Sequence, residues 1–498
     1  MMSSMETTMS ASQTDQLGPS VPSEPRDPHE FQELHEISEA SEHVPVVVAG
    51  AGYAGLCAAL ELHDAGIEVL VLEANDRVGG RTLSLRNEHG TVIDHGGQWV
   101  GPTQKDFLSL VERFGVETFP TYLGGTNIER WIDGSKRDFK IAGPDDGPGM
   151  REYLEAMERI DELALTVDLQ NPAATPNAEA LDSETVHSYL ERTVPNRDAR
   201  LRMALAVQSV WTVEPRDISM LHFLFYIGSA GNFDQLMEAE GCAQETRFVD
   251  GAQEAAKRIA AVLGERVRLG TPVRRIVRDD HGATIFAGDG AIRADRVIVA
   301  VPPSAGQQIV HEPMLPVARM RWLSKSPMGD VVKIHVSYET PFWRADGLSG
   351  EATLYGDPSV GFVFDNSPHD LDTGVLVCFV YADRVQQWKA RGAEGRRREV
   401  LDTLVELFGE RAAVPVDYVE KDWSEEPFIG GAYAANPTPG AWIEHGEAGW
   451  RNPVGVLHWA GTETASVWNG YIDGAISSGR RAAAEVRAEF AASTVESR

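Results

Sequence analysis

The clearest hydrophobic pattern in the chain is an unbroken apolar run at residues 44–49, followed at once by a glycine-rich stretch. Such a run, without polar alternation, is typical of a strand buried on both faces of a parallel sheet. Residues 53–66 have a helical pattern that ends at a glycine suited to a C-cap, and residues 67–73 form a second apolar run. These segments predict a βαβ unit, preceded by a disordered tail at residues 1–43, which are rich in Ser, Thr, Pro and acids.

Later segments again have the strand and helix pattern of this unit, after two stretches with a different pattern. Residues 121–248 are mostly helical in pattern, whereas residues 331–338, 361–364 and 375–381 predict strands of a second sheet. Residues 454–486 give a strand, a glycine-rich turn and a long helix. We therefore predict an α/β fold with two interleaved domains. The first is a Rossmann-like, glutathione-reductase-like dinucleotide domain that comprises residues 44–117, 249–318 and 427–488. The second is an α+β substrate domain that comprises residues 118–248 and 319–426, and residues 489–498 form a C-terminal tail.

Composition and charge exclude several classes of protein. The 498 residues are 42% hydrophobic and 24% charged, as in a soluble globular protein. Forty-five basic and seventy-five acidic residues give a net charge of −30, which repels nucleic acid and anionic lipid. An acidic field could concentrate cationic substrates, but a solubilising surface is the plainer interpretation. No stretch of about eighteen apolar residues is present, so we expect no membrane span.

The three cysteines, Cys57, Cys242 and Cys378, lie far apart without metal-ligand spacing. The sequence therefore predicts neither a disulfide framework nor a metal site, and it fits a reducing cytoplasm. Residues 1–43 contain neither a basic start nor an apolar core, so they are not a signal peptide.

The glycines Gly50, Gly52 and Gly55 lie between the first predicted strand and its helix, in the sequence GAGYAG. They let the backbone approach a pyrophosphate, which the helix N-terminus stabilises. Glu73 follows Gly55 by eighteen residues and ends the second strand, where a carboxylate can accept both hydroxyls of an adenosine ribose. A tight turn without a ligand is the alternative, but the strand, helix and acid together favour dinucleotide binding.

The sequence EANDRVGGRT (73–82) distinguishes flavin from nicotinamide. It places Arg77, Gly79, Gly80 and Arg81 directly after the acid, and it resembles the flavin-binding extension of the glutathione-reductase-like and amine oxidase families. Two arginines beside a diphosphate make charge-assisted contacts, and the glycine pair permits a sharp reversal. The alternative is a solvated arginine pair on a loop. FAD is the cofactor that this pattern favours.

Six motifs in order resemble those of flavin-containing monoamine oxidases: GAGYAGLCAA, EANDRVGGRT, GGQWVGPTQ, GDVVKIHVSYETPFWR, DWSEEPFIGGAY and HWAGTETASVWNGYIDGAISSGRRAA. The similarity covers about residues 44–488. The last three motifs are specific to amine oxidation, and the first three to flavoproteins of this fold. The resemblance implies FAD contacts from Gly50, Gly52, Gly55, Glu73, Arg77, Gly80, Arg81, Gly97, Gln98, Trp99, Val273, Trp423, Gly461, Glu463, Tyr471 and Ile472.

The resemblance also implies roles around the reacting centre. Lys333 matches a lysine that hydrogen-bonds through a water to flavin N5; an outward, solvated side chain is the alternative. Tyr433 and Tyr471 match two aromatic rings that face each other before the isoalloxazine, although isolated tyrosines are more often core residues. Trp423 matches a tryptophan packed near the flavin or fills the core. Gln244 matches a glutamine that lines the substrate cavity, or it is a surface amide.

One position departs from the mammalian-type enzymes of this family. There the residue before the first of the two tyrosines is a cysteine that forms a thioether to the flavin; here it is Ala432. A methyl group cannot form that bond, and Cys242 and Cys378 lie elsewhere in the pattern. We therefore predict that FAD is held non-covalently.

The expected activity is that of a soluble amine oxidase, in which an amine and O2 give an imine, then aldehyde and ammonia, with H2O2. An apolar pocket containing Phe362 and Phe364 favours a small or aromatic primary monoamine. A polyamine or diamine oxidase needs a distal carboxylate, for which Glu214 and Asp234 are candidates, and an L-amino-acid oxidase needs a cation such as Arg216. A flavin-dependent desaturase or dehydrogenase, or a non-catalytic FAD-binding module, are the other classes. The sequence leaves the oligomeric state open, a homodimer included.

Overall fold

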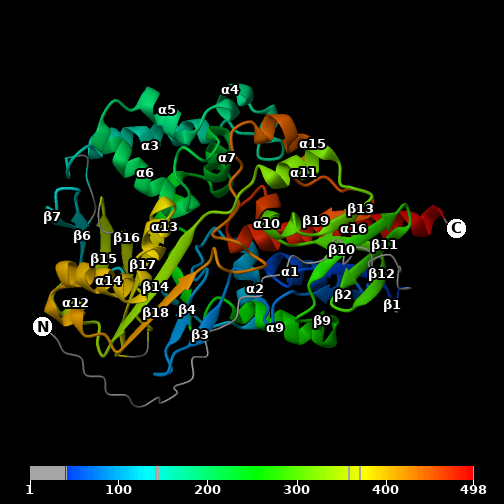
Figure 1. The fold of residues 1–498 in the computed structure, drawn as a ribbon, viewed down its shortest axis with the longest axis horizontal. Helices are drawn as coiled ribbons and strands as arrows, with labels where there is room; N and C mark the ends of the chain where they lie inside the picture. The colour runs from blue at the N-terminus through cyan, green and yellow to red at the C-terminus, as the bar shows by residue number, and fades with distance from the viewer. Residues whose placement is uncertain are drawn as a thin grey trace, which may run out of the picture. The chain divides into compact units, whose positions relative to one another are not determined.

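The strand predicted at the start of the folded chain lies at the centre of a parallel region of a large sheet (Figure 1). In the computed structural model, which describes residues 40, 42–140, 143, 145–356, 359–369 and 372–496, this strand is β1 (Glu42–Ala49). It pairs in parallel with β2 (Val69–Leu72) and β12 (Gly290–Val299). Its start corrects the predicted tail boundary by two residues. The rest of that predicted tail, residues 1–39 and 41, lies outside the described residues.

The first sheet has the strand order β13-β10-β11-β12-β1-β2-β9, and β19 pairs with β12. The strands not yet given bounds are β9 (Val267–Arg268), β10 (Val273–Asp279), β11 (Gly282–Ala287), β13 (Val310–Glu312) and β19 (Leu457–Trp459). Successive valines of β1 point to opposite faces, and each face packs into a separate apolar cluster. The α/β prediction is thereby confirmed.

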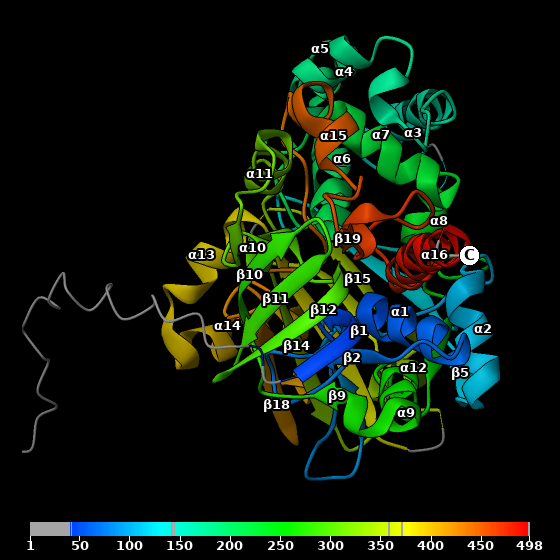
Figure 2. The same cartoon turned by 90° about the vertical axis from the view of Figure 1, so that its right-hand side faces the viewer.

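Four helices pack against one face of this sheet (Figure 2). They are α1 (Tyr53–Asp64), α2 (Lys105–Phe114), α9 (Glu254–Leu263) and α16 (Ile472–Glu496). Because α16 continues to Glu496, most of the segment predicted as a C-terminal tail is helical. None of the helices in the described ranges has both the length and the apolar character that crossing a bilayer requires.

The second sheet has the strand order β18-β14-β17-β16-β15-β6-β7. Its strands are β6 (Thr126–Arg130), β7 (Lys136–Phe139), β14 (Val331–Tyr338), β15 (Leu348–Leu354), β16 (Val360–Asp365), β17 (Gly374–Tyr381) and β18 (Asp417–Asp422). The hairpin of β6 and β7 is a short exception to the expectation that residues 121–248 are mostly helical, since six α-helices lie within the described residues 150–237. Its strands are short and largely polar, and they are stabilised by pairing at the sheet edge rather than by a strong apolar pattern of their own.

The two faces of the second sheet have different environments. One face packs against α13 (Asp383–Lys389) and α14 (Gly392–Phe408), with Ile334 and Cys378 in the shared apolar cluster. The opposite face carries Lys333, Phe362 and Phe379, which line a cavity. The alternation along β14 therefore directs Lys333 to the side away from these helices.

The remaining elements complete the unit formed by residues 40–498. Short two-stranded sheets pair β3 (Ser84–Arg86) with β4 (Val92–Asp94) and β5 (Thr118–Pro120) with β8 (Thr246–Phe248). The other helices are α3 (Met150–Ala164), α4 (Ala178–Ser183), α5 (Val186–Thr193), α6 (Arg197–Trp211), α7 (Met220–Ala230), α8 (Phe233–Met237), α10 (Pro303–Gly306), α11 (Val317–Ser324), α12 (Phe342–Ala345) and α15 (Glu447–Gly449). The two large sheets draw their strands from the segments assigned to the two predicted domains, whose division stays a prediction.

Candidate active site

The glycine loop between β1 and α1 is shaped by two close backbone approaches. A Cβ on Gly50, whose φ is +104°, would lie 2.8 Å from the carbonyl oxygen of Ala300, and a Cβ on Gly55 would lie 2.0 Å from that of Gly50. Gly52 differs, because its Cβ would meet only the Cα of Gly80, at 3.8 Å. The loop is therefore closed by Gly50 and Gly55 and leaves space beside Gly52, as a pyrophosphate would require.

Two cavities meet beside this loop. Gly50, Gly52, Glu73, Gly80 and Val273 are among the residues that line the smaller one. Both cavities are also lined by Ala300 and Val301, so they adjoin at the end of β12. A long, two-part site of this kind fits a dinucleotide, with the adenosine portion on the side of Glu73.

The Glu73 carboxylate is anchored by backbone and side-chain donors. Its Oε2 accepts from the backbone N–H of Ala51 at 2.6 Å, and its Oε1 accepts from the backbone and side-chain nitrogens of Asn75 at 2.8 and 3.0 Å. A carboxylate oxygen can accept a further hydrogen bond. The predicted contact of Glu73 with a ribose stays a prediction, which this placement supports.

The larger cavity collects most of the predicted site residues. Those that line it are Arg81, Gly97, Gln98, Trp99, Gln244, Lys333, Phe362, Phe364, Trp423, Tyr433, Gly461, Tyr471 and Ile472. Three predicted residues, Gly55, Arg77 and Glu463, line neither cavity. Gly55 shapes the loop, and the other two act through their neighbours.

Arg77 braces the turn that follows the acid. Its Nη1 donates to the carbonyl oxygens of Gly80 and Thr82 at 2.9 and 3.1 Å, and its Nη2 lies 3.7 Å from a carboxylate oxygen of Glu426. We expected this guanidinium to contact the diphosphate directly. In the structure Nη1 holds the Gly80 turn, whereas Nη2 is buried without a hydrogen-bond partner, so the contact of Arg77 with a diphosphate stays a prediction.

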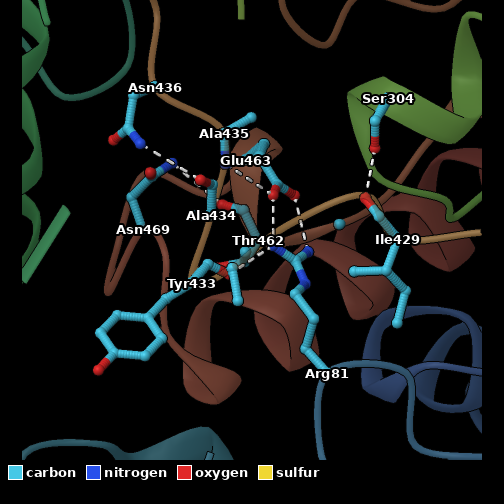
Figure 3. A network of polar contacts seen from close by, with 12 residues as sticks. Arg81, Ser304, Ile429, Tyr433, Ala434, Ala435, Asn436, Thr462, Glu463 and Asn469 are labelled. Carbon is cyan, nitrogen blue, oxygen red and sulfur yellow. Dashed lines mark hydrogen bonds and ion pairs between the residues drawn. The ribbon is translucent and has the colours of Figure 1, made fainter. Parts of the chain in front are cut away.

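Arg81 and Glu463 form a two-pronged ion pair (Figure 3). Arg81 Nη1 and Nη2 lie 2.6 and 3.1 Å from the two carboxylate oxygens, and Nη1 also donates to the carbonyl oxygen of Tyr433 at 2.8 Å. Burial is the largest single influence and raises the pKa of Glu463, but the Arg81 charge, the hydrogen bonds from Arg81 and the backbone donors together lower this pKa overall. The pair joins the glycine-rich turn to the segment that carries Tyr433, which explains the position of Glu463 behind the cavity wall.

The Lys333 ammonium is buried and fully hydrogen-bonded. Nζ donates to the carbonyl oxygens of Asp94 and Gly96 at 2.7 and 2.9 Å and to Oε1 of Gln98. Only 3% of the residue is exposed, which excludes the solvated alternative. Burial lowers the pKa of Lys333 to about 7, although the Asp94 carboxylate acts in the opposite direction. The water-mediated contact with flavin N5 stays a prediction.

Two stacked aromatic pairs form one wall of the larger cavity. The rings of Phe362 and Phe364 on β16 are 5.8 Å apart with an interplanar angle of 2°, and those of Phe379 and Tyr381 on β17 are 5.7 Å apart at 8°. Tyr381 and Tyr433 line this cavity as well, and burial raises the pKa of both phenols. Sequence reasoning missed Phe379 and Tyr381, although alternate aromatic positions near the end of the predicted strand 375–381 carried the signal.

One backbone carbonyl at the end of α8 fixes two further lining residues. Leu236 O accepts from the hydroxyl of Tyr471 at 3.1 Å and from Nε2 of Gln244 at 2.8 Å. The Oε1 atom of Gln244 is buried without a hydrogen-bond partner, so an acceptor is available to a ligand donor. Tyr433 and Tyr471 line the same cavity, and their face-to-face arrangement stays a prediction.

The charged residues considered for alternative substrates lie outside the cavity. Of the described residues, no aspartate or glutamate lines the larger cavity. Glu214 accepts two hydrogen bonds from the Gln208 amide, Asp234 is exposed, and the Arg216 guanidinium pairs with Asp383. The larger cavity therefore offers neither a distal carboxylate nor a free guanidinium from these candidates.

Several features fit a flavin in the joined cavities. Gly52 leaves space at the loop, and Nε1 of Trp99, which lines the larger cavity, is buried without a hydrogen-bond partner. α16 begins at Ile472, another lining residue, so its positive end is directed at the cavity. The buried Ala432 presents a methyl group to the same space. Within the described ranges, no group of three or more His, Cys, Asp or Glu side chains could hold a metal ion.

Comparison with known proteins gives consistent matches over most of the chain. The sequence profile described as flavin containing amine oxidoreductase matches residues 53–487. A Mycobacterium tuberculosis protein named as a flavin-containing monoamine oxidase, AofH, is 40% identical over 447 residues, 89% of this chain and 97% of that protein. A Synechocystis protein named L-amino acid dehydrogenase is 36% identical over 450 residues, 88% and 93% of the two chains. A solved structure of putrescine oxidase bound to putrescine has a TM-score of 0.86 at 34% identity, covering 90% of this chain and 99% of that one.

Proposed function

This chain belongs to the flavin-containing amine oxidoreductases, and we propose that it catalyses the FAD-dependent oxidative deamination of a primary monoamine. The products are an aldehyde, ammonia and H2O2, with O2 as the electron acceptor. The resemblance to this family that the sequence motifs indicated is confirmed, and with it an oxidoreductase that acts on amines and carries a flavin.

The lining of the larger cavity is the observation that carries the choice of a monoamine. Among the residues described, it contains no carboxylate that could pair with the distal ammonium of a diamine. It contains two cations, but Arg81 is neutralised by Glu463, and the three hydrogens of the Lys333 ammonium are taken by three oxygens. An amino-acid carboxylate therefore has no free cation to pair with. The stacked aromatic pairs suit a small apolar or aromatic side chain instead.

We propose that FAD occupies both cavities and is held without a covalent bond. Gly50, Gly52 and Glu73 hold its pyrophosphate and ribose, and Trp99, Trp423 and Ile472 surround its ring. Bound FAD supplies the acceptor for the two electrons of the amine and passes them to O2. Ala432 supports non-covalent retention because its methyl group cannot form a thioether. Precipitation with trichloroacetic acid should therefore release all yellow colour into the supernatant, and colour that stays in the pellet would contradict this.

The protein contributes orientation, exclusion of water and charge. Tyr433 and Tyr471 place aromatic faces in a cavity whose described lining holds no carboxylate, so an uncharged amine enters at a lower desolvation cost than an ammonium does. Deprotonated amine is therefore the form that reacts. The Lys333 ammonium lies in the cavity wall, where a positive charge stabilises the negative charge that builds up as O2 is reduced.

A peroxide assay tests the proposal directly. Purified yellow protein is mixed in air with benzylamine, tyramine, an alkylamine, putrescine and L-leucine, and H2O2 is measured with a coupled peroxidase. We expect the monoamines to give kcat/KM values at least about tenfold above those of putrescine and L-leucine, since an unpaired buried charge costs more than 1.4 kcal/mol. No peroxide with any amine, despite bound FAD, would overturn the proposed function, whereas faster oxidation of putrescine would overturn only the choice of a monoamine.

A further inference from the structure

The segment that contains Gly96 and Gln98 supplies every hydrogen-bond acceptor of the Lys333 ammonium. These acceptors come from positions 94, 96 and 98, which alternate along the chain. Two of them are backbone carbonyls, whose direction is fixed by the main chain. The third is the side-chain amide of Gln98, which can present either an oxygen or an NH2 group. The proton affinity of Lys333 therefore depends on which way this amide faces.

Asn366 is the hydrogen-bond partner on the far side of the Gln98 amide, and its own Nδ2 is buried without a hydrogen-bond partner. Gln98 Nε2 donates to Asn366 Oδ1 at 2.6 Å, and each residue is only 1% exposed. Asn366 follows β16 directly, and its backbone N–H donates to Val375 O at 2.7 Å, so its position is tied to β17. If the Gln98 amide were reversed, its NH2 group would face the ammonium and its oxygen would face another oxygen. Both contacts are repulsive in a buried site.

We propose that Asn366 is a positioning residue that, through Gln98, stabilises the protonated form of Lys333 in the wall of the flavin cavity. Nothing in the reaction requires Asn366 to touch substrate, and it does not line the larger cavity. Its effect is to keep an oxygen on the third hydrogen of the ammonium. This inference rests on the proposed place of Lys333 beside FAD.

The other groups around Lys333 leave it as the one that titrates near neutral pH. Burial lowers the pKa of His95 to about 4 and that of His335 well below its ordinary value, so both rings are neutral. The Asp94 carboxylate favours the ammonium, and the Arg247 guanidinium opposes it. The rings of Trp99 and Phe379 lie 5.6 and 5.7 Å from Nζ and carry no charge.

Two substitutions of Asn366 should move the titration of Lys333 in opposite directions. Asn366→Leu removes the acceptor for Gln98 Nε2, and the Gln98 amide no longer favours the orientation that points its oxygen at the ammonium. The titration midpoint of Lys333 should then fall by about one pH unit, which is the equivalent of one hydrogen bond to a charged group. Asn366→Asp keeps an acceptor and adds a negative charge, so the midpoint should rise. Asn127→Leu removes an amide that accepts from Ser349 in the same sheet and serves as the control.

The midpoint is measured in the FAD-loaded protein without turnover. Selective 13C labelling of the ε carbons gives eight lysine signals, and Lys333→Met identifies that of Lys333. The rate of reoxidation of the reduced protein by O2, monitored by stopped-flow spectroscopy across the same pH range, gives the kinetic pH profile. We expect the kinetic midpoint to move with the NMR midpoint in each Asn366 variant and to stay unchanged in Asn127→Leu.

The outcomes separate this inference from the proposed function. If Lys333→Met reoxidises at the wild-type rate, the proposed role of Lys333 is wrong. If Lys333→Met is slow but Asn366→Leu titrates as the wild type does, the role of Lys333 stands and the positioning role of Asn366 is refuted. Should Asn366→Leu fail to fold, Asn366→Asp decides alone, because an unchanged or lowered midpoint would refute the inference.

Discussion

The glycine loop allows a prediction in which two neighbouring glycines respond differently to the same substitution. In Gly55→Ala the new methyl carbon would lie 2.0 Å from the Gly50 carbonyl oxygen, about 1.4 Å short of the 3.4 Å at which ordinary contact begins. It would also lie 3.1 Å from Val48 Cγ1. Neither side of the contact can yield easily, since the Gly50 N–H donates to Leu72 O at 2.8 Å and α1 packs on α16.

The cost of this clash follows from its size. Overpacking a buried site costs about 1–3 kcal/mol, and a clash between two backbone segments belongs at the upper end. If the loop conformation that binds FAD is destabilised by about 3 kcal/mol, the Kd of FAD should rise roughly 100-fold. Gly52→Ala should behave differently, because Gly52 has an ordinary φ of −71° and an open Cβ direction. It should leave the FAD-free protein as stable as wild type and weaken FAD by at least about tenfold, since its methyl group occupies the proposed pyrophosphate space.

Thermal unfolding of the FAD-free proteins and titration with FAD, followed by flavin fluorescence, separate the two effects. Gly290→Ala is the control, because a Cβ there meets nothing within 4 Å and its backbone conformation is ordinary. We expect a lower Tm and weaker FAD binding for Gly55→Ala, and weaker binding alone for Gly52→Ala. A wild-type Tm and Kd in Gly55→Ala would refute the packing argument, and a wild-type Kd in Gly52→Ala would refute the pyrophosphate position.

Three further predictions concern charged residues. Glu463→Gln should lower the Tm at pH 7, because it costs about 2–3 kcal/mol to leave Arg81 without its charge partner. The pKa of Glu463 is lowered in the folded protein, so the Tm difference between wild type and variant should shrink as the pH falls below about 4.5. A Tm difference that stays constant with pH would contradict the ion pair. Lys333 loses its proton near pH 7 in the folded protein but near pH 10.5 in the unfolded chain, so the unfolded state binds more protons between these two values. The stability contributed by Lys333 should therefore rise with pH across that window. Lys333→Met should flatten this part of the curve of Tm against pH. Arg216→Ala should leave KM for a monoamine within about twofold, since an exposed pair with Asp383 contributes little, and a large rise in KM would place Arg216 in the substrate path.

Local pattern was sufficient for much of the first sheet and for the position of its glycine loop. The unbroken valines at residues 46–48 need both faces covered, and this requirement alone predicts a central parallel strand. The β6 and β7 hairpin was not predictable in the same way, because its stability comes from pairing with β15, a strand more than two hundred residues later. Propensity over a short window does not contain that contact.

The sequence predicted which types of side chain form the candidate site better than it predicted which residues those side chains contact. A lone lysine within the apolar strand 331–338 indicated a buried, partnered ammonium, but its acceptors at positions 94, 96 and 98 are distant in sequence. Arg77 and Arg81 look equivalent in the motif, yet one braces a turn and the other pairs with Glu463. Which of two similar arginines meets a ligand depends on long-range packing, which a local motif does not encode.

The walls of the larger cavity come from residues between Tyr53 and Ala475, with contributions from the second large sheet, from the residues that follow β12 and from the start of α16. During synthesis the βαβ segment emerges early, but the larger cavity, the proposed place of the flavin ring, is incomplete until the segment around Tyr471 leaves the ribosome. Capture of the flavin is consequently a late event in the life of each new chain. Cells starved of riboflavin should accumulate full-length, colourless protein that turns yellow when FAD is added.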